Sequence, residues 1–160
     1  MTTKQRILIS FIFLSTLLQA QKLAGFYKID DLLHRIALKD TTYVVNFWAL
    51  WCKPCIQELP AFDSLNSELK GMPVKVLLVN LDFKEDGVTK VNAFLKKNKI
   101  NTECVLLDEI DGNSYINLIS EKWSGAIPAT LFKKGNQKMF IEHKLNLAHL
   151  KKHVGEIQAN

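Results

Sequence analysis

Residues 47–55 of this 160-residue chain read FWALWCKPC. The run 43–48 is short, apolar and rich in β-forming residues, which is typical of a buried strand, and a helix is expected to begin near Cys52. A cysteine at a helix N-terminus has its thiolate stabilised by free backbone N–H groups and by the helix dipole, and Lys53 adds positive charge. Pro54 suits a first turn, where an N–H would be unpaired. Because two residues separate them, the sulfurs of Cys52 and Cys55 can meet and form a reversibly oxidised dithiol.

Apolar runs on both sides of this stretch predict alternating strands and helices. We expect helices over 29–37, 88–99, 114–123 and 147–157, strands over 43–48, 74–81 and 103–107, and a hairpin made of 129–132 and 138–141. Asp30 is a candidate cap of the first helix, and Pro60 is expected to kink the helix that follows Cys52. This order predicts an α/β sandwich with parallel strands in the centre and an antiparallel edge.

The composition is that of a globular protein, with 48% hydrophobic and 23% charged residues and a net charge of +5. These values exclude a disordered chain, a collagen-like repeat and a multi-pass membrane protein. Three cysteines are too few for a small scaffold held together by disulfides. A chain of this length can bury about 68% of its unfolded surface, so one domain with one full core is expected.

Residues 1–20 have the pattern of a secretory signal peptide. Lys4 and Arg6 precede the apolar run 7–18, which is shorter than the roughly 20 residues of a membrane span, and Ala20 is a small residue for cleavage. An uncleaved anchor and a buried helix are the alternatives. Removal of this segment would leave 21–160 as one domain with 21 − 2 = 19 basic against 16 acidic residues, or +3. This modest charge predicts no nucleic-acid partner, and the leader predicts a periplasmic or otherwise extracytoplasmic protein without stable membrane insertion after cleavage.

The motif at 47–55, the proline eight residues after Cys52 and the segment AIPAT at 126–130 together resemble the thioredoxin superfamily. The resemblance covers roughly residues 30–157. It implies a three-layer sandwich with a central mixed β-sheet flanked by helices, and it implies that Pro128 is a cis-proline opposite the cysteines.

Asn46 and Glu58 narrow the resemblance. Thioredoxins carry a buried Asp where this chain has Asn46, whereas Glu58 follows Cys55 by one helical turn. With the leader, this pattern resembles the TlpA and ResA-like thiol–disulfide oxidoreductases, whose central insertion would correspond to 88–99. The resemblance implies an exported enzyme that reduces disulfides of partner proteins, without a cofactor or a metal. Family members include reductants for cytochrome c maturation, and a membrane electron donor is a candidate partner.

Roles follow from thiol exchange and from the resemblance. Cys52 is expected to form the mixed disulfide and Cys55 to resolve it. Glu58 is expected to exchange a proton with Cys55, and an exposed first-turn acid is the alternative.

The expected substrate-binding residues are Trp51, Pro54, Ile127 and Pro128. Pro128 would shape the groove, and Ile127 would offer backbone groups for strand addition by a partner chain. Trp51 would add apolar contact surface, and the alternatives are a plain core tryptophan and a trans Pro128 in an ordinary turn.

Three rival functions stay open: a metal-binding chaperone, a peroxidase and a non-catalytic binding module. The chain has one Cys pair, and His149 and His153 lie far from it in sequence, which disfavours a zinc finger. A peroxiredoxin would carry Thr where this chain has Ala49. The third cysteine, Cys104, has the surroundings of an inert buried residue, with a redox or intermolecular role as the alternative.

Overall fold

The computed structural model describes residues 23–159, so the predicted signal segment lies outside the described residues. The elements in chain order are β1 (Gly25–Tyr27), α1 (Ile29–Arg35), β2 (Thr42–Trp48), α2 (Lys53–Glu68), β3 (Val74–Asn80), α3 (Lys84–Lys97), β4 (Glu103–Leu107), the 3-10 turn η1 (Gly112–Ser114), α4 (Ile116–Ile119), β5 (Ala129–Lys134), β6 (Gln137–Ile141) and α5 (Leu147–Ala159). Between residues 23 and 159, no helix combines the length and apolar character needed to cross a membrane.

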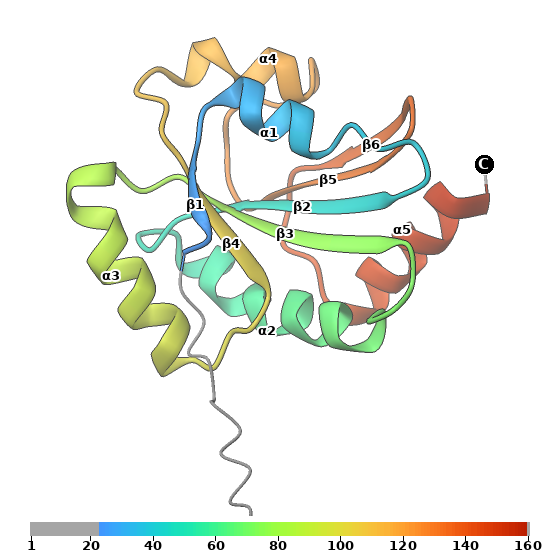
Figure 1. The fold of residues 1–160 in the computed structure, drawn as a ribbon, viewed down its shortest axis with the longest axis horizontal. Coiled ribbons are helices and arrows are strands. Elements are labelled where there is room, and N and C mark those ends of the chain that lie inside the picture. Colours follow the sequence, from blue (N-terminus) through green and yellow to red (C-terminus); the bar gives the residue numbers. More distant parts are fainter. Residues whose placement is uncertain (1–22, 160) are drawn as a thin grey trace, which may run out of the picture.

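The strands form one six-stranded sheet in the order β1-β4-β3-β2-β5-β6 (Figure 1). The first four strands of this order pair in parallel, whereas β5 is antiparallel to β2 and β6 is antiparallel to β5. The predicted parallel centre and antiparallel edge are therefore confirmed. Strand β1 was not predicted, because three residues are too few to show a strand pattern.

Helices cover both faces of the sheet, which makes three layers (Figure 1). On one face, α2, α3 and α5 contribute Phe62, Leu95 and Val154 to the larger core cluster. On the other face, α1 and α4 contribute Leu32 and Ile119 to a second cluster. Strand β2 runs between the two clusters and is buried at every position. The carboxyl end of β2, from which the loop to Cys52 departs, is thus held from both sides.

Two helices differ from the expectation for local reasons. Lys28, not Asp30, is the N-cap residue of α1, and its N–H donates to Asp31 Oδ2 over 3.0 Å. The expected helix 114–123 is reduced to η1 and α4, because Ser120 has extended backbone and its hydroxyl accepts the N–H of Lys122 over 3.2 Å. Hydroxyl groups that bond to nearby backbone compete with the helix in this way.

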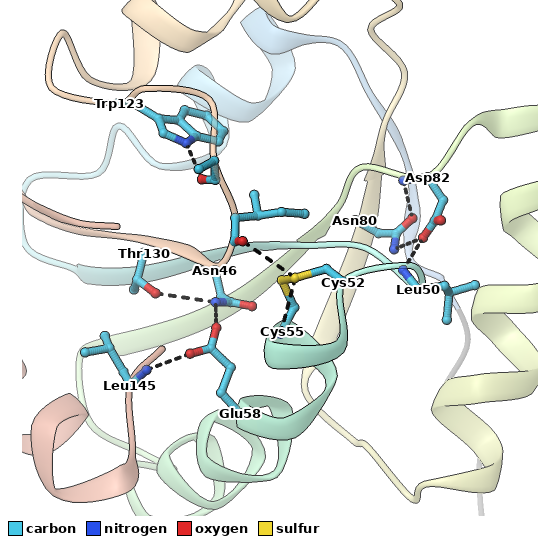
Figure 2. The surroundings of a disulfide bond; sticks show 12 residues. Asn46, Leu50, Cys52, Cys55, Glu58, Asn80, Asp82, Trp123, Thr130 and Leu145 are labelled. Carbon is cyan, nitrogen blue, oxygen red and sulfur yellow. Dashed lines mark hydrogen bonds between the residues drawn. A yellow bond between two sulfur atoms is a disulfide. The ribbon is translucent and has the colours of Figure 1, made fainter. Parts of the chain in front are cut away.

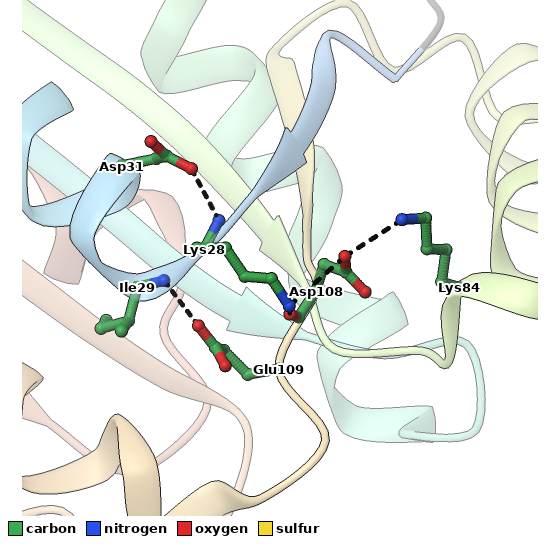
Figure 3. Close-up of polar contacts among 6 residues, drawn as sticks. All are labelled: Lys28, Ile29, Asp31, Lys84, Asp108 and Glu109. Atoms are coloured by element: carbon green, nitrogen blue, oxygen red, sulfur yellow. Dashed lines mark hydrogen bonds and ion pairs between the residues drawn. The ribbon is translucent and has the colours of Figure 1, made fainter.

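The start of α3 also differs, since the helix begins at Lys84 rather than at Val88. Its first turn has no apolar stripe, so the hydrophobic spacing did not reveal it. A polar network ties this turn to the residues that directly follow β4 and β1 (Figure 3). Lys84 Nζ lies 3.0 Å from Asp108 Oδ2, and Lys28 also pairs with Asp108 at 3.5 Å. The hydrogen bond from Lys84, more than any other interaction, lowers the pKa of Asp108.

Candidate active site

Cys52 and Cys55 form a disulfide at the N-terminus of α2 (Figure 2). Cys52 is the N-cap residue, and its Sγ accepts the N–H of Cys55 over 3.3 Å. Lys53 and Pro54 occupy the first two helical positions, as the sequence predicts. Cys52 is 5% exposed and Cys55 is fully buried, so an incoming sulfur reaches Cys52 first. When the pair is reduced, the free N–H groups of the first turn and the helix dipole favour a thiolate at this position.

The loop before β5 lies opposite the disulfide. Ile127–Pro128 is a cis peptide bond, and the carbonyl oxygen of Ile127 lies 3.7 Å from Cys52 Sγ (Figure 2). Trp123 Nε1 donates to the carbonyl of Ala126 over 2.8 Å and so anchors this loop to the second core cluster. Segments about 75 residues apart in sequence are thereby brought together at the sulfur atoms.

Glu58 is buried, with 2% of its surface exposed, so the alternative of an exposed acid is wrong. Its Oε1 accepts from Asn46 Nδ2 and its Oε2 from the N–H of Leu145, each over 2.7 Å (Figure 2). Burial raises the pKa of Glu58 to about 7, although these two hydrogen bonds act in the opposite direction. Asn46 Nδ2 also lies 3.4 Å from Thr130 Oγ1, whereas its buried Oδ1 has no hydrogen-bond partner among residues 23–159. A carboxyl group that titrates near neutral pH thus lies on α2, one turn after Cys55.

The two tryptophans of the motif have different surroundings. Trp48 is fully buried and packs against Phe94, with ring centroids 5.5 Å apart. Trp51 is 69% exposed, so the alternative that it is a core residue is wrong. Its ring forms part of a surface groove of about 340 Å³, lined by Leu50, Trp51, Asp82, Phe83, Gly87 and Lys90.

Asp82 and Asn80 belong to the site, although neither was predicted from the sequence. Asp82 Oδ2 accepts the N–H of Leu50 over 2.8 Å, two residues before Cys52 (Figure 2). Asn80 is fully buried at the end of β3, where it pairs in register with Trp48. The available signal was a polar Asn-x-Asp that begins at the last residue of an apolar strand, since ends of neighbouring parallel strands meet at one edge.

The remaining candidates lie apart from the disulfide. Cys104 is free and fully buried on β4, and burial raises the pKa of its thiol, which matches the inert interpretation. His153 Nδ1 lies 2.8 Å from Glu156 on the same helix. Over residues 23–159 there is no group of three or more metal-ligating side chains arranged to hold an ion.

Comparisons with known proteins agree with this geometry. The AhpC/TSA family matches residues 27–139. The thioredoxin-like protein YneN of Bacillus subtilis is 35% identical over 82 residues, which are 51% of this chain and 47% of that protein. The thiol-disulfide oxidoreductase ResA of Geobacillus thermodenitrificans is 26% identical over 117 residues, 71% of this chain and 62% of the relative. The matches thus span less than two thirds of these curated relatives.

Solved structures show the same fold. The crystal structure of StoA from Bacillus subtilis superposes with a TM-score of 0.58 at 28% identity, covering 73% of this chain and 84% of that one. A thioredoxin-related protein from Neisseria meningitidis serogroup B gives a TM-score of 0.68 at 21% identity, covering 78% and 90%, and supports the fold alone. The family match includes both the disulfide and the Ile127–Pro128 loop, and the chain therefore belongs to the AhpC/TSA family, with a thioredoxin-like fold.

Proposed function

We propose that this protein is an exported thiol–disulfide oxidoreductase that reduces disulfides of partner proteins through Cys52 and Cys55. One observation carries the proposal: the two sulfurs meet at the N-terminus of α2, beside the backbone carbonyl of the half-buried Ile127. The similarity to relatives named as thiol-disulfide oxidoreductases supports it. Export rests on the signal pattern of residues 1–20.

The reaction starts from the reduced protein. The Cys52 thiolate attacks one sulfur of the substrate disulfide, forms a mixed disulfide and releases the other substrate sulfur as a thiolate. Cys55, as thiolate, then attacks Cys52 Sγ, which releases the second substrate sulfur and closes the Cys52–Cys55 disulfide. Two electrons pass to the substrate, whose two thiolates take up two protons. A dithiol electron donor, for which a membrane protein is a candidate, must reduce the pair again.

Glu58 is the proposed proton acceptor for Cys55. Cys55 is fully buried and must lose a proton before it can attack. A carboxyl group with a pKa near 7, one helical turn away on α2, is matched to accept that proton near neutral pH and to return it in the reverse step. Asn46 and the backbone N–H of Leu145 hold the carboxylate in place by two hydrogen bonds.

The proposed substrate surface surrounds Cys52. Trp51 offers an exposed aromatic ring, and Pro54 lies in the first turn beside the sulfur. Ile127 would pair its backbone with an extended partner chain, while Pro128 presents no N–H to the sulfur atoms. A role in cytochrome c maturation is the specific form of this activity that the ResA-like pattern suggests.

The test combines a trapping variant with a reduction potential. Cys55→Ser should accumulate mixed disulfides with protein substrates, and Cys52→Ser should abolish exchange; normal turnover by Cys55→Ser would refute the two-cysteine mechanism. A potential of about −270 mV or lower in glutathione or dithiothreitol buffers supports a reductant, whereas about −120 to −180 mV would reverse the direction to oxidation or isomerisation. Absence of all exchange would favour a non-catalytic binding module, and stoichiometric metal in the reduced protein a metal chaperone.

A further inference from the structure

Asp82 connects the loop after β3 to the backbone that leads into Cys52. Its Oδ2 accepts two hydrogen bonds of 2.8 Å, one from the N–H of Leu50 and one from Asn80 Nδ2. The N–H of Asp82 in turn donates to Asn80 Oδ1 over 3.1 Å. Because Asn80 is fully buried in β3, its hydrogen bonds attach Asp82 to a rigid strand (Figure 2).

The loop that Asp82 holds is short and sets the position of the reacting sulfur. Residues 49–51 connect β2 to the N-cap residue of α2. Backbone bonds hold the two ends of the loop, from Leu81 N–H to the Trp48 carbonyl over 2.8 Å and from Cys52 N–H to the Ala49 carbonyl over 3.1 Å. The N–H of Leu50, in the middle of the loop, is held by the Asp82 side chain.

Helix α3 packs directly on Asp82 and restricts it further. A Cβ atom at Gly87 would lie 3.3 Å from Asp82 Cβ and 3.0 Å from Leu106 Cδ1, so the helix approaches this closely because position 87 is glycine. A glycine inside a helix is less stable than an alanine there, which is consistent with a packing requirement at this position. Asp82 is thus confined between β3, α3 and the loop before Cys52.

We propose that Asp82 is a positioning residue for thiol exchange: its bond to Leu50 N–H keeps Cys52 Sγ over the free N–H groups of α2. The catalytic role of Asp82 rests on the proposed function. Its effect on the position of Cys52 rests on its hydrogen bonds alone. A displaced loop would move the sulfur away from the Cys55 N–H, which now lies 3.3 Å from it. Displacements of about 1 Å at a reacting group can lower rates by up to about 100-fold.

Two variants distinguish the effect of the Asp82 hydrogen bonds from the effect of its negative charge. A single oxygen, Oδ2, accepts both bonds, so Asp82→Asn can keep both with its amide oxygen in that place. Asp82→Ala loses both bonds and the charge. Loss of a nearby negative charge alone would favour the Cys52 thiolate and speed its reaction, so a slower Asp82→Ala variant cannot be explained by charge.

The measurement is the rate constant for alkylation of Cys52 by iodoacetamide at pH 7 in the reduced protein, carried out in a Cys104→Ala background. We expect Asp82→Ala to be slower than the parent by about tenfold and Asp82→Asn to be at least as fast as the parent. The same rank order is expected for kcat in the reduction of a peptide disulfide. An Asp82→Ala rate equal to or above that of the parent would overturn the inference, as would equal slowing of both variants.

Asp63→Ala is the matched control. Asp63 Oδ1 accepts the N–H groups of Asn101 and Thr102 over 2.6 and 2.8 Å. Like Asp82, it holds the backbone of a loop with its carboxylate, but that loop is the connection between α3 and β4. Both alanine variants should lower Tm by roughly 5 °C, and only Asp82→Ala should slow alkylation. If no variant, the parent included, reduces any disulfide although the alkylation pattern holds, the proposed function fails and the positioning effect stands.

Discussion

Asn46 Nδ2 donates a hydrogen bond of 2.7 Å to Glu58 Oε1, and both side chains are buried between β2 and α2. An amide donor stabilises the charged carboxylate, while burial destabilises it. Burial is the larger effect, and the pKa of Glu58 rises to about 7. The carboxyl group therefore changes charge near neutral pH at the base of the disulfide helix.

The raised pKa of Glu58 predicts a pH-dependent stability. Between its ordinary value of 4.5 and about 7, the folded protein keeps a proton that the unfolded chain has lost. The free energy of unfolding of the oxidised protein should therefore fall as pH rises through this window, by about 3 kcal/mol in total, and should change no further through this group above pH 7. Urea titrations at half-unit steps from pH 4.5 to 8.5 measure this slope.

Glu58→Gln is the matched variant for that measurement. The glutamine can keep the bond from Leu145 N–H, and Asn46 can turn its amide so that its unpaired Oδ1 accepts from the glutamine. The variant should fold and lose the slope between pH 4.5 and 7. An equally steep slope in Glu58→Gln would assign the pH dependence to another group.

The same substitution predicts a kinetic change. If Glu58 takes the Cys55 proton, Glu58→Gln should slow resolution of the mixed disulfide by about 100-fold near pH 7, the lower end of what general acid–base catalysis contributes. The first attack by Cys52 should be nearly unchanged. Stopped-flow measurement of both steps from pH 5 to 9 separates them, and an unaltered pH profile of the second step would remove Glu58 from the mechanism.

We expect the Cys104→Ala variant to show that the third cysteine is dispensable for thiol–disulfide exchange. Cys104 is fully buried on β4, and burial raises the pKa of its thiol, which keeps it protonated and unreactive. The loss of one buried sulfur should cost about 1 kcal/mol of stability. Disulfide reduction and the reduction potential of the pair should be unchanged; a folded variant with altered potential would give Cys104 a redox role.

The sequence predicted the parts of the fold that depend on local pattern. The continuous apolar runs of β2, β3 and β4 identified buried parallel strands, because such strands are covered on both faces. The Cys-x-x-Cys spacing at a strand-to-helix boundary predicted the disulfide, because both sulfurs lie at one end of the same helix. The ends of the elements were harder to predict. The short strand β1 was missed, since three residues show no pattern.

The sequence could not determine features that depend on contacts between distant elements. Helical spacing places Glu58 one turn after Cys55, but one of the hydrogen bonds to its carboxylate comes from Leu145, 87 residues later. The role of Asp82 depends on the register of β3 against β2, which sets Asn80 beside Trp48. The residues next to Glu58 and Asp82 in the sequence do not reveal these contacts.

We expect the Trp51→Ala variant to bind protein substrates less tightly without a loss of stability. The ring is 69% exposed beside Cys52, so its removal leaves no buried cavity, whereas apolar contact with a substrate chain would be lost. KM for a protein disulfide should rise by about tenfold, which corresponds to about 1.4 kcal/mol, and the rate with oxidised glutathione should stay nearly the same. Leu118→Ala, which also removes a half-exposed apolar side chain but on α4, is the control and should change neither value. An equal rise of KM for both disulfides in Trp51→Ala would instead mean that the ring acts on the sulfur itself, and the assignment of Trp51 to the partner surface would be wrong.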